Sequence, residues 1–273
     1  MVLYVDLVKI ANETLSIIDK GEYTFHKLQW TPENIQADKE YREVFDLEKK
    51  VGYRGMPITL YDSATSAYKV KEKVCILNFA SAKHPGGGFL TGARAQEECL
   101  CRCSTLYRHL ESHSDLYKWS NEHLNKGLYS TWAIYSPKVS IFRDGRDYGF
   151  RNEKTASFIT CPAVNAGVAR RHGISQEKID AEMKKRIEHI IKVAAINGEK
   201  HLVLGAFGCG VFRNDPERVA EIFLNVLFEY GGYFDSYEFA FPTKDANYEA
   251  FKRVSDRAIN LYDKYREENC NGN

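Results

Sequence analysis

Two nearly continuous apolar runs, at residues 74–80 and 201–207, each lead directly into a glycine-rich loop. Runs of this kind are typical of strands that are buried on both faces of a sheet. In an open α/β sheet, ligands bind in the crevice at the carboxyl ends of the strands, where such loops lie. The sequence therefore predicts an α/β protein whose ligand site forms where the two loops meet.

The rest of the chain alternates between predicted strands and predicted helices. Further strands are expected at residues 58–62, 128–135, 139–143, 157–161 and 237–241, and helices at residues 2–19, 95–110, 175–197, 216–230 and 248–267. This alternation indicates a layered α/β fold with helices on both sides of a mixed sheet. Thr31 and Pro32 suit a helix N-cap and a first helical residue, so a polar helix is expected to follow. We assign residues 1–50 to an N-terminal helical extension packed on the core and residues 51–273 to a single compact domain.

The charge balance narrows the class of partner. The chain has 38 basic and 37 acidic side chains, with a formal net charge of +1. A dedicated electrostatic nucleic-acid binder would usually carry a basic excess, so that class is disfavoured. A small phosphate-bearing ligand held by backbone amides remains compatible with this composition.

The seven cysteines do not form a metal-binding pattern, because no CxxC pair occurs. Cys99, Cys101 and Cys103 alternate along a predicted helix, where residues two apart point to different faces and cannot converge on zinc. We therefore expect reduced thiols and a reducing compartment. No secretory signal and no membrane-spanning apolar run is recognised. We expect an intracellular, cytoplasmic protein without membrane contact, with the nucleus left open.

A triple glycine leads through a short loop into a pair of glutamates. Gly86, Gly87 and Gly88 allow the backbone to approach a ligand closely with positive φ. In the adjacent pair that follows, Glu97 and Glu98, one carboxyl can orient a substrate while the other gives or takes a proton. Taken alone, the glycines would be a flexible loop and the glutamates a solvated helix start. Their joint spacing after a buried strand indicates an active site instead.

The second loop joins the other apolar run to a helix that begins near Pro216. It contains Gly208, Cys209, Gly210, Val211 and Phe212. Backbone N–H groups in such a loop can converge on phosphate oxygens, and the helix N-terminus adds a favourable partial charge. The loop lacks the Gly-Lys-Ser/Thr ending of a Walker motif, and it lies too late in the chain for a Rossmann GxGxxG. The plain alternative is a tight strand-to-helix turn.

These two segments carry a family resemblance. Residues 85–98 resemble the GGG…QEE signature of the poly(ADP-ribose) glycohydrolases, and the Gly-Cys-Gly-Val-Phe at 208–212 is similar to the diphosphate loop of macrodomains, particularly of the microbial-type glycohydrolases. The resemblance covers roughly residues 50–245, and the first 50 residues look like the extension of the microbial group. It implies a macrodomain-like three-layer fold.

The resemblance also implies roles for individual residues. Glu98 would be the catalytic acid and then the base, and Glu97 would hold ribose hydroxyls. The substrate-binding residues would be Asn78, Gly86, Gly87, Gly88, Gln96, Gly208, Cys209, Gly210, Val211 and Phe212, with Gln96 supporting the loop and Phe212 packed against the terminal ribose. An acid must be protonated at working pH, so we expect burial, Glu97 or a ligand phosphate to raise the pKa of Glu98. No metal or cofactor is implied.

The function implied is exo-acting hydrolysis of poly(ADP-ribose) to ADP-ribose by a monomer. A hydrolase of mono-ADP-ribosylated protein or nucleic acid is the main alternative, because the same loops would serve it. A non-catalytic ADP-ribose reader is disfavoured by the intact glutamate pair, and a nucleotide-dependent transferase lacks a nucleophile or metal constellation. Asn165 and Gly167 lie after another predicted strand and receive no role, and His84 is expected to be a solvated or packing residue.

Overall fold

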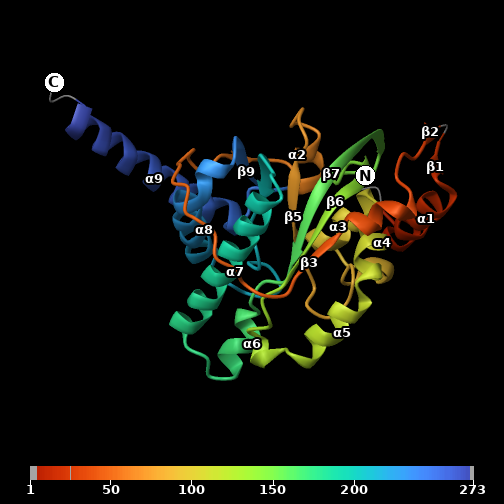
Figure 1. Cartoon of the computed structure of the whole chain (residues 1–273), viewed down its shortest axis with the longest axis horizontal. Helices are drawn as coiled ribbons and strands as arrows, with labels where there is room; N and C mark the ends of the chain where they lie inside the picture. Colours follow the sequence, from red (N-terminus) through yellow and green to blue (C-terminus); the bar gives the residue numbers. More distant parts are fainter. Residues whose placement is uncertain (1–4, 25, 271–273) are drawn as a thin grey trace.

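The computed structural model describes residues 5–24 and 26–270, with side chains described up to residue 259. Its centre is a seven-stranded mixed sheet (Figure 1). In spatial order the strands are β3 (Lys39–Tyr41), β6 (Ala133–Arg143), β7 (Phe150–Cys161), β5 (Cys75–Phe79), β8 (His201–Leu204), β9 (Ser236–Ala240) and β4 (Ile58–Thr59). The five strands from β7 to β4 are parallel, whereas β6 runs antiparallel to both β7 and β3.

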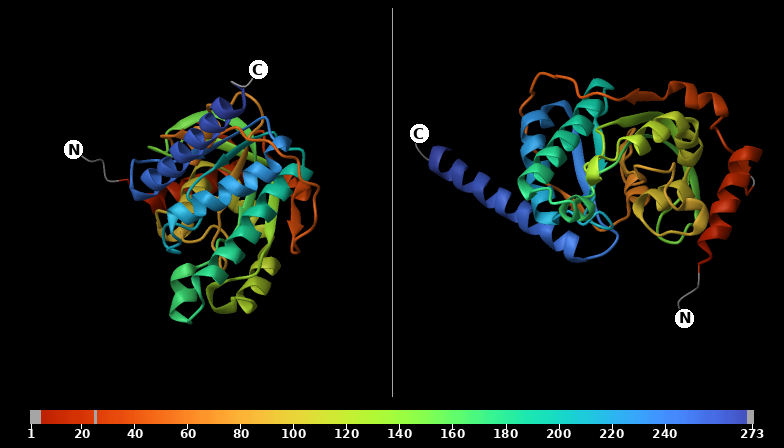
Figure 2. Two further views of the ribbon diagram at one scale, coloured as in Figure 1. Left: turned by 90° about the vertical axis from the view of Figure 1, so that its left-hand side faces the viewer. Right: turned by 90° about the horizontal axis from the view of Figure 1, so that it is seen from below.

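Helices cover both faces of this sheet, as Figure 2 shows in its right-hand view. One layer contains α7 (Gln176–Ile196), α8 (Pro216–Tyr230) and α9 (Ala246–Cys270), and the other contains α2 (Ser63–Ala67), α3 (Gln96–Cys103), α4 (Leu106–Ser112) and α5 (Ser114–Glu122), with α1 (Leu7–Lys20) outside them. Alternate residues of β5 separate the two layers, since Cys75 and Leu77 join the core under α7 and α8 while Ile76 joins the core under α3. The three-layer α/β fold predicted from the sequence is therefore confirmed.

Most elements lie where the sequence predicts them. The helix α8 begins at Pro216 and ends at Tyr230, and α7 is capped by the Ser175 side chain and followed by Gly198 with φ +73°. The helix predicted at 95–110 is instead two helices. Thr105 donates its N–H to Ser140 of β6, and its hydroxyl accepts from the Ser140 N–H, so this residue pairs with the sheet and interrupts the helix.

Other boundaries differ from the prediction. Residues 133–135 and 139–143 of the two predicted strands lie in the single strand β6, which has two register shifts, whereas residues 128–132 are not a strand. The strand β7 begins earlier than residue 157. The short helices α5 and α6 (Ala166–Arg171) were not predicted. The described residues also contain four 3₁₀ turns: η1 (Pro32–Ala37), η2 (Phe89–Thr91), η3 (Asn125–Gly127) and η4 (Gly231–Tyr233).

The first fifty residues are only partly helical. The predicted first helix is confirmed from Leu7 onward, while its positions 2–4 lie outside the described residues. A small hairpin of β1 (Glu22–Tyr23) and β2 (His26–Lys27) follows. In place of the expected polar helix after Pro32, the chain forms η1 and then β3, which adds an edge strand to the central sheet. The strand β3 belongs to the same sheet as the later strands. The division of the chain at residue 50 stays a prediction.

A buried network fixes this N-terminal segment to α4. His109 is fully buried, accepts a hydrogen bond from the Trp30 indole at 2.9 Å and meets Asp38 at 3.0 Å through Nδ1. Since Nε2 is the acceptor, Nδ1 carries the proton that is donated to Asp38. Burial alone would lower the pKa of His113, but hydrogen bonds to Asp38 and Glu40 raise it above its usual value. The network explains why residues 31–41 follow the sheet edge instead of forming a separate helix.

Six cysteine side chains are described, and all are free thiols: Cys75, Cys99, Cys101, Cys103, Cys161 and Cys209. Within the described part of the chain, no group of three histidine, cysteine, aspartate or glutamate side chains could hold a metal ion. Among the described helices, none combines the length and apolarity needed to cross a bilayer.

Candidate active site

Three neighbouring parallel strands bring the predicted loops together. Asn78 of β5 lies opposite Thr160 of β7, and β8 pairs with the other side of β5. The segments that follow these strands therefore share one edge of the sheet, and those after β5 and β7 run toward the end of the molecule where α5 and α6 lie (Figure 1). The rings of Phe79 and Phe207, 5.7 Å apart, join the ends of β5 and β8. The two glycine loops therefore follow neighbouring strands, and contact between the loops themselves stays a prediction.

The triple glycine lies directly over the glutamate pair. Gly86 and Gly87 have φ values of +67° and +57°, a region that favours glycine. A Cβ on Gly87 would lie 2.4 Å from Glu98 Oε1, and one on Gly86 would lie 2.7 Å from the Tyr107 ring. Only glycine therefore allows this backbone to lie so close to the carboxylates.

Glu98 has one oxygen held and one without a protein partner. The Gly88 N–H donates to Glu98 Oε1 at 2.8 Å, and the residue is only 7% exposed. Glu98 Oε2 is buried and has no hydrogen-bond partner among the described residues. Leaving a buried polar atom unpaired costs about 1–3 kcal/mol, so such an atom is a strong candidate for a ligand contact.

Glu97 is buried more deeply, and each of its carboxyl oxygens accepts a hydrogen bond from the protein. Its Oε2 accepts from the Ser81 N–H at 2.8 Å, and its Oε1 accepts from Asn78 Nδ2 at 3.2 Å. Burial raises the pKa of Glu97 to about 8, with a further rise from the charge of Glu98 and a partial offset from the two donors. Glu97 therefore holds a proton at neutral pH.

This pKa predicts a pH-dependent stability. In the unfolded chain the Glu97 pKa returns to its usual value near 4.5, so between that pH and about 8 the folded state holds a proton that the unfolded state has lost. The free energy of unfolding then falls as pH rises through this range. We expect Glu97→Gln to remove this dependence, so that the melting temperature of the variant minus that of wild type rises from pH 5 to pH 8. A difference that stays constant across those pH values would contradict the assignment.

Asn78 contacts the glutamate pair directly, whereas Gln96 contacts the backbone of β5. Asn78 is fully buried, donates to Glu97 and to Thr160 Oγ1 at 3.2 Å, and has an Oδ1 atom without a partner among the described residues. Gln96 accepts from the Phe79 N–H and donates to the carbonyl oxygen of Leu77, so it fastens the start of α3 to β5. The amide of Gln96 is thus used by the protein, and its predicted contact with the substrate stays a prediction.

The second loop is a tight turn with an open outer surface. Gly208 has φ +73°, and a Cβ there would lie 2.5 Å from the Ala163 side chain, so glycine is required. The Asn214 side chain donates to the carbonyl oxygens of Val164 and Gly208 and closes the turn. Gly210 faces open space, and Val211 is 82% exposed. The Cys209 N–H is taken by the Ala206 carbonyl oxygen within the turn.

Phe212 is held by residues that sequence reasoning did not assign. Its ring lies edge-on to Tyr129 with the centroids 5.8 Å apart, and its carbonyl oxygen accepts from the Gly167 N–H. The Tyr129 hydroxyl in turn accepts from the Asn165 side chain, and Tyr129 is buried with φ +57°. A left-handed aromatic residue has no signal in a single sequence, so Tyr129 could not have been found that way. Asn165 and Gly167, which received no role from the sequence, therefore support the Phe212 loop.

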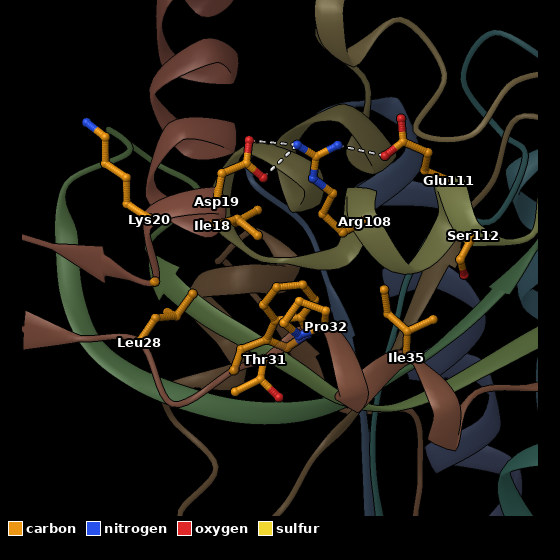
Figure 3. Close-up of a pocket in the computed structure, with 12 residues that line it drawn as sticks. Ile18, Asp19, Lys20, Leu28, Thr31, Pro32, Ile35, Arg108, Glu111 and Ser112 are labelled. Atoms are coloured by element: carbon orange, nitrogen blue, oxygen red, sulfur yellow. Dashed lines mark hydrogen bonds and ion pairs between the residues drawn. The ribbon is translucent and has the colours of Figure 1, made fainter.

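Two other features lie outside this arrangement. A cavity of about 620 Å³ is lined by residues of α1, η1 and α4, and none of the predicted site residues borders it (Figure 3). The guanidinium of Arg108 at its rim is already paired with Asp19 and Glu111, as the dashed lines in Figure 3 show. His84 is exposed, as expected for a solvated residue.

A mixed α/β sheet with a buried glutamate pair under one glycine loop, and a second glycine loop on the adjacent strand, is the arrangement of a macrodomain-like glycohydrolase. Comparison with known proteins agrees. Residues 11–144 match the family model described as microbial-type poly(ADP-ribose) glycohydrolase (PARG), catalytic domain. None of the curated protein sequences matches the chain.

Solved structures extend the match over most of the chain. It is similar to the poly(ADP-ribose) glycohydrolase from Thermomonospora curvata, with 32% sequence identity, a TM-score of 0.80, and coverage of 91% of this chain and 98% of that one. It is also similar to the Deinococcus radiodurans enzyme in complex with ADP-ribose, with 36% identity, a TM-score of 0.68, and coverage of 75% of this chain and 85% of that one. The chain belongs to the microbial-type poly(ADP-ribose) glycohydrolases and is a glycohydrolase catalytic domain.

Proposed function

We propose that this chain hydrolyses the ribose–ribose O-glycosidic bonds of poly(ADP-ribose), with Glu98 as general acid and then general base. The observation that carries the proposal is the unpartnered Oε2 of buried Glu98, beside Glu97, whose pKa is raised to about 8 by burial. A pair of buried carboxyls with one free oxygen suits a reaction that needs a proton donor in a site shielded from water.

The reaction would proceed with one carboxyl acting twice. In its protonated form, Glu98 gives its proton to the ribose oxygen that departs, while the bond from that oxygen to the anomeric carbon breaks and the carbon gains oxocarbenium character. The resulting carboxylate takes a proton from water, whose oxygen bonds to the anomeric carbon. The products are ADP-ribose and a shortened chain, and Glu98 is protonated again.

The remaining site residues would position the bound unit. The diphosphate would rest on the loop with Gly208, Gly210 and Val211, whose outer side faces open space or solvent. Phe212 would pack against the terminal ribose, while Glu97 and the free Oδ1 of Asn78 would bind its hydroxyls. The D. radiodurans relative with ADP-ribose and a T. curvata relative with the inhibitor ADP-HPD support this class of ligand.

We further propose that cleavage is exo-acting. Tyr129 and α6 contact the Phe212 loop and fix its position, and in that position the loop would enclose a chain end. The test is the size distribution of products early in the reaction of wild type with long polymer. We expect free ADP-ribose from the first time point and slowly shortening chains. Early accumulation of intermediate-length oligomers would show internal cleavage and contradict this part of the proposal.

A further inference from the structure

Four cations gather beside the Phe212 loop, although they come from three distant segments. They are Lys126 of η3, Arg170 and Arg171 of α6, and Arg213. Backbone hydrogen bonds hold the segments together, since the Asn165 N–H donates to Gly127 at 2.8 Å and the Gly167 N–H donates to Phe212 at 3.0 Å. The Arg213 side chain also lies over Gly167, where an added Cβ would be 3.2 Å from Arg213 Cδ. The fold thus concentrates positive charge at one place.

No described carboxylate neutralises these cations. Nearby Asp180 pairs with Arg218, Glu182 pairs with Lys178, and Asp215 caps α8. Arg170 makes neutral contacts only, with the Gln176 side chain and the Arg213 carbonyl oxygen. All four side chains are exposed. An exposed cluster of unpaired cations is a favourable surface for phosphate groups.

Two of the four cationic residues have a backbone conformation that is unfavourable for a residue with a side chain. Lys126 has φ +55° and Arg213 has φ +59°, both in the left-handed region where glycine or asparagine would fit with less steric cost. Positively charged side chains therefore stand at two strained backbone positions in this cluster. Strain of this kind gathers at ligand-binding segments.

We propose that Lys126, Arg170, Arg171 and Arg213 form a subsite for the diphosphate of the polymer unit next to the one that is hydrolysed, on the leaving-group side. The inference rests on the proposed function. Arg213 directly follows Phe212, against which the scissile ribose would pack, so these cations border the site of the hydrolysed unit. The subsite would favour polymer over a single ADP-ribose, which has no second diphosphate.

The test uses Glu98→Gln as the parent, so that polymer can be bound without cleavage. Lys126→Asn with Arg171→Gln removes two charges, and asparagine tolerates the left-handed backbone at residue 126. Lys71→Gln with Lys138→Gln is the matched control, because both lysines are exposed and Lys71 precedes β5, at the opposite edge of the sheet. Affinity for defined-length polymer and for ADP-ribose is measured as a function of salt.

We expect the Lys126/Arg171 variant to bind polymer about three- to tenfold more weakly than the control, with a salt slope smaller by about 1.4 and unchanged ADP-ribose affinity. Equal polymer affinity in the two variants, or an equal loss for ADP-ribose, would overturn the proposal. Failure of wild type to hydrolyse polymer is a separate result that would contradict the proposed function instead.

Discussion

Replacing Glu98 by glutamine is expected to lower the turnover of poly(ADP-ribose) by about 100- to 10,000-fold, the usual contribution of a general acid. The amide oxygen can still accept the hydrogen bond that the Gly88 N–H donates to Glu98 Oε1, so the loop and the pocket should keep their shape. The amide cannot give up a proton to the departing ribose oxygen, and it cannot then activate water. Binding of ADP-ribose should therefore be retained.

The measurement is the steady-state rate of ADP-ribose release, with calorimetric binding of ADP-ribose alongside. Glu122→Gln is the matched control, since it makes the same chemical change at an exposed glutamate outside the site. The control should keep the wild-type rate. A Glu98→Gln variant that keeps more than a tenth of the wild-type rate would show that another group supplies the proton.

Gly87→Ala should lower kcat/KM by about 100-fold while leaving the protein folded. The added Cβ would lie 2.4 Å from Glu98 Oε1. The end of a side chain yields more readily than backbone, so the structure would relieve the overlap by moving the carboxylate. A displacement of about 1 Å in a catalytic group can cost about 100-fold in rate.

Gly173→Ala separates this effect from backbone strain. Gly173 has φ +73°, close to the +57° of Gly87, but nothing lies within 4 Å of its added Cβ. Both variants carry the cost of a left-handed alanine, about 1–2 kcal/mol, and should show similar losses of melting temperature. Only Gly87→Ala should lose activity. Equal activity in the two variants would mean that the glycine loop does not set the position of Glu98.

The parts of the fold that the sequence predicts well are those with local causes. Pro216 starts α8 because its ring fixes φ and removes an N–H that a first helical residue does not need. Likewise, Gly86 to Gly88 and the glutamates are close in sequence, so their contact over one strand-to-helix connection could be predicted from spacing alone.

The parts that were missed depend on distant partners. The break at Thr105 exists because Ser140 pairs with it, and β3 forms because β6 offers an edge and Asp38 is held by α4. Tyr129 reaches Phe212 only through a left-handed backbone and the Asn165 amide. Such contacts join segments tens of residues apart or more, and no local propensity encodes them.

The most direct test of the account is release of ADP-ribose by wild type from purified poly(ADP-ribose), with mono-ADP-ribosylated protein and DNA assayed in parallel. We predict that free ADP-ribose accumulates from the polymer and not from the mono-modified targets. Release from a mono-modified target alone would move the activity to a mono-ADP-ribosyl hydrolase. Tight binding of ADP-ribose without any release would contradict the role given to Glu98.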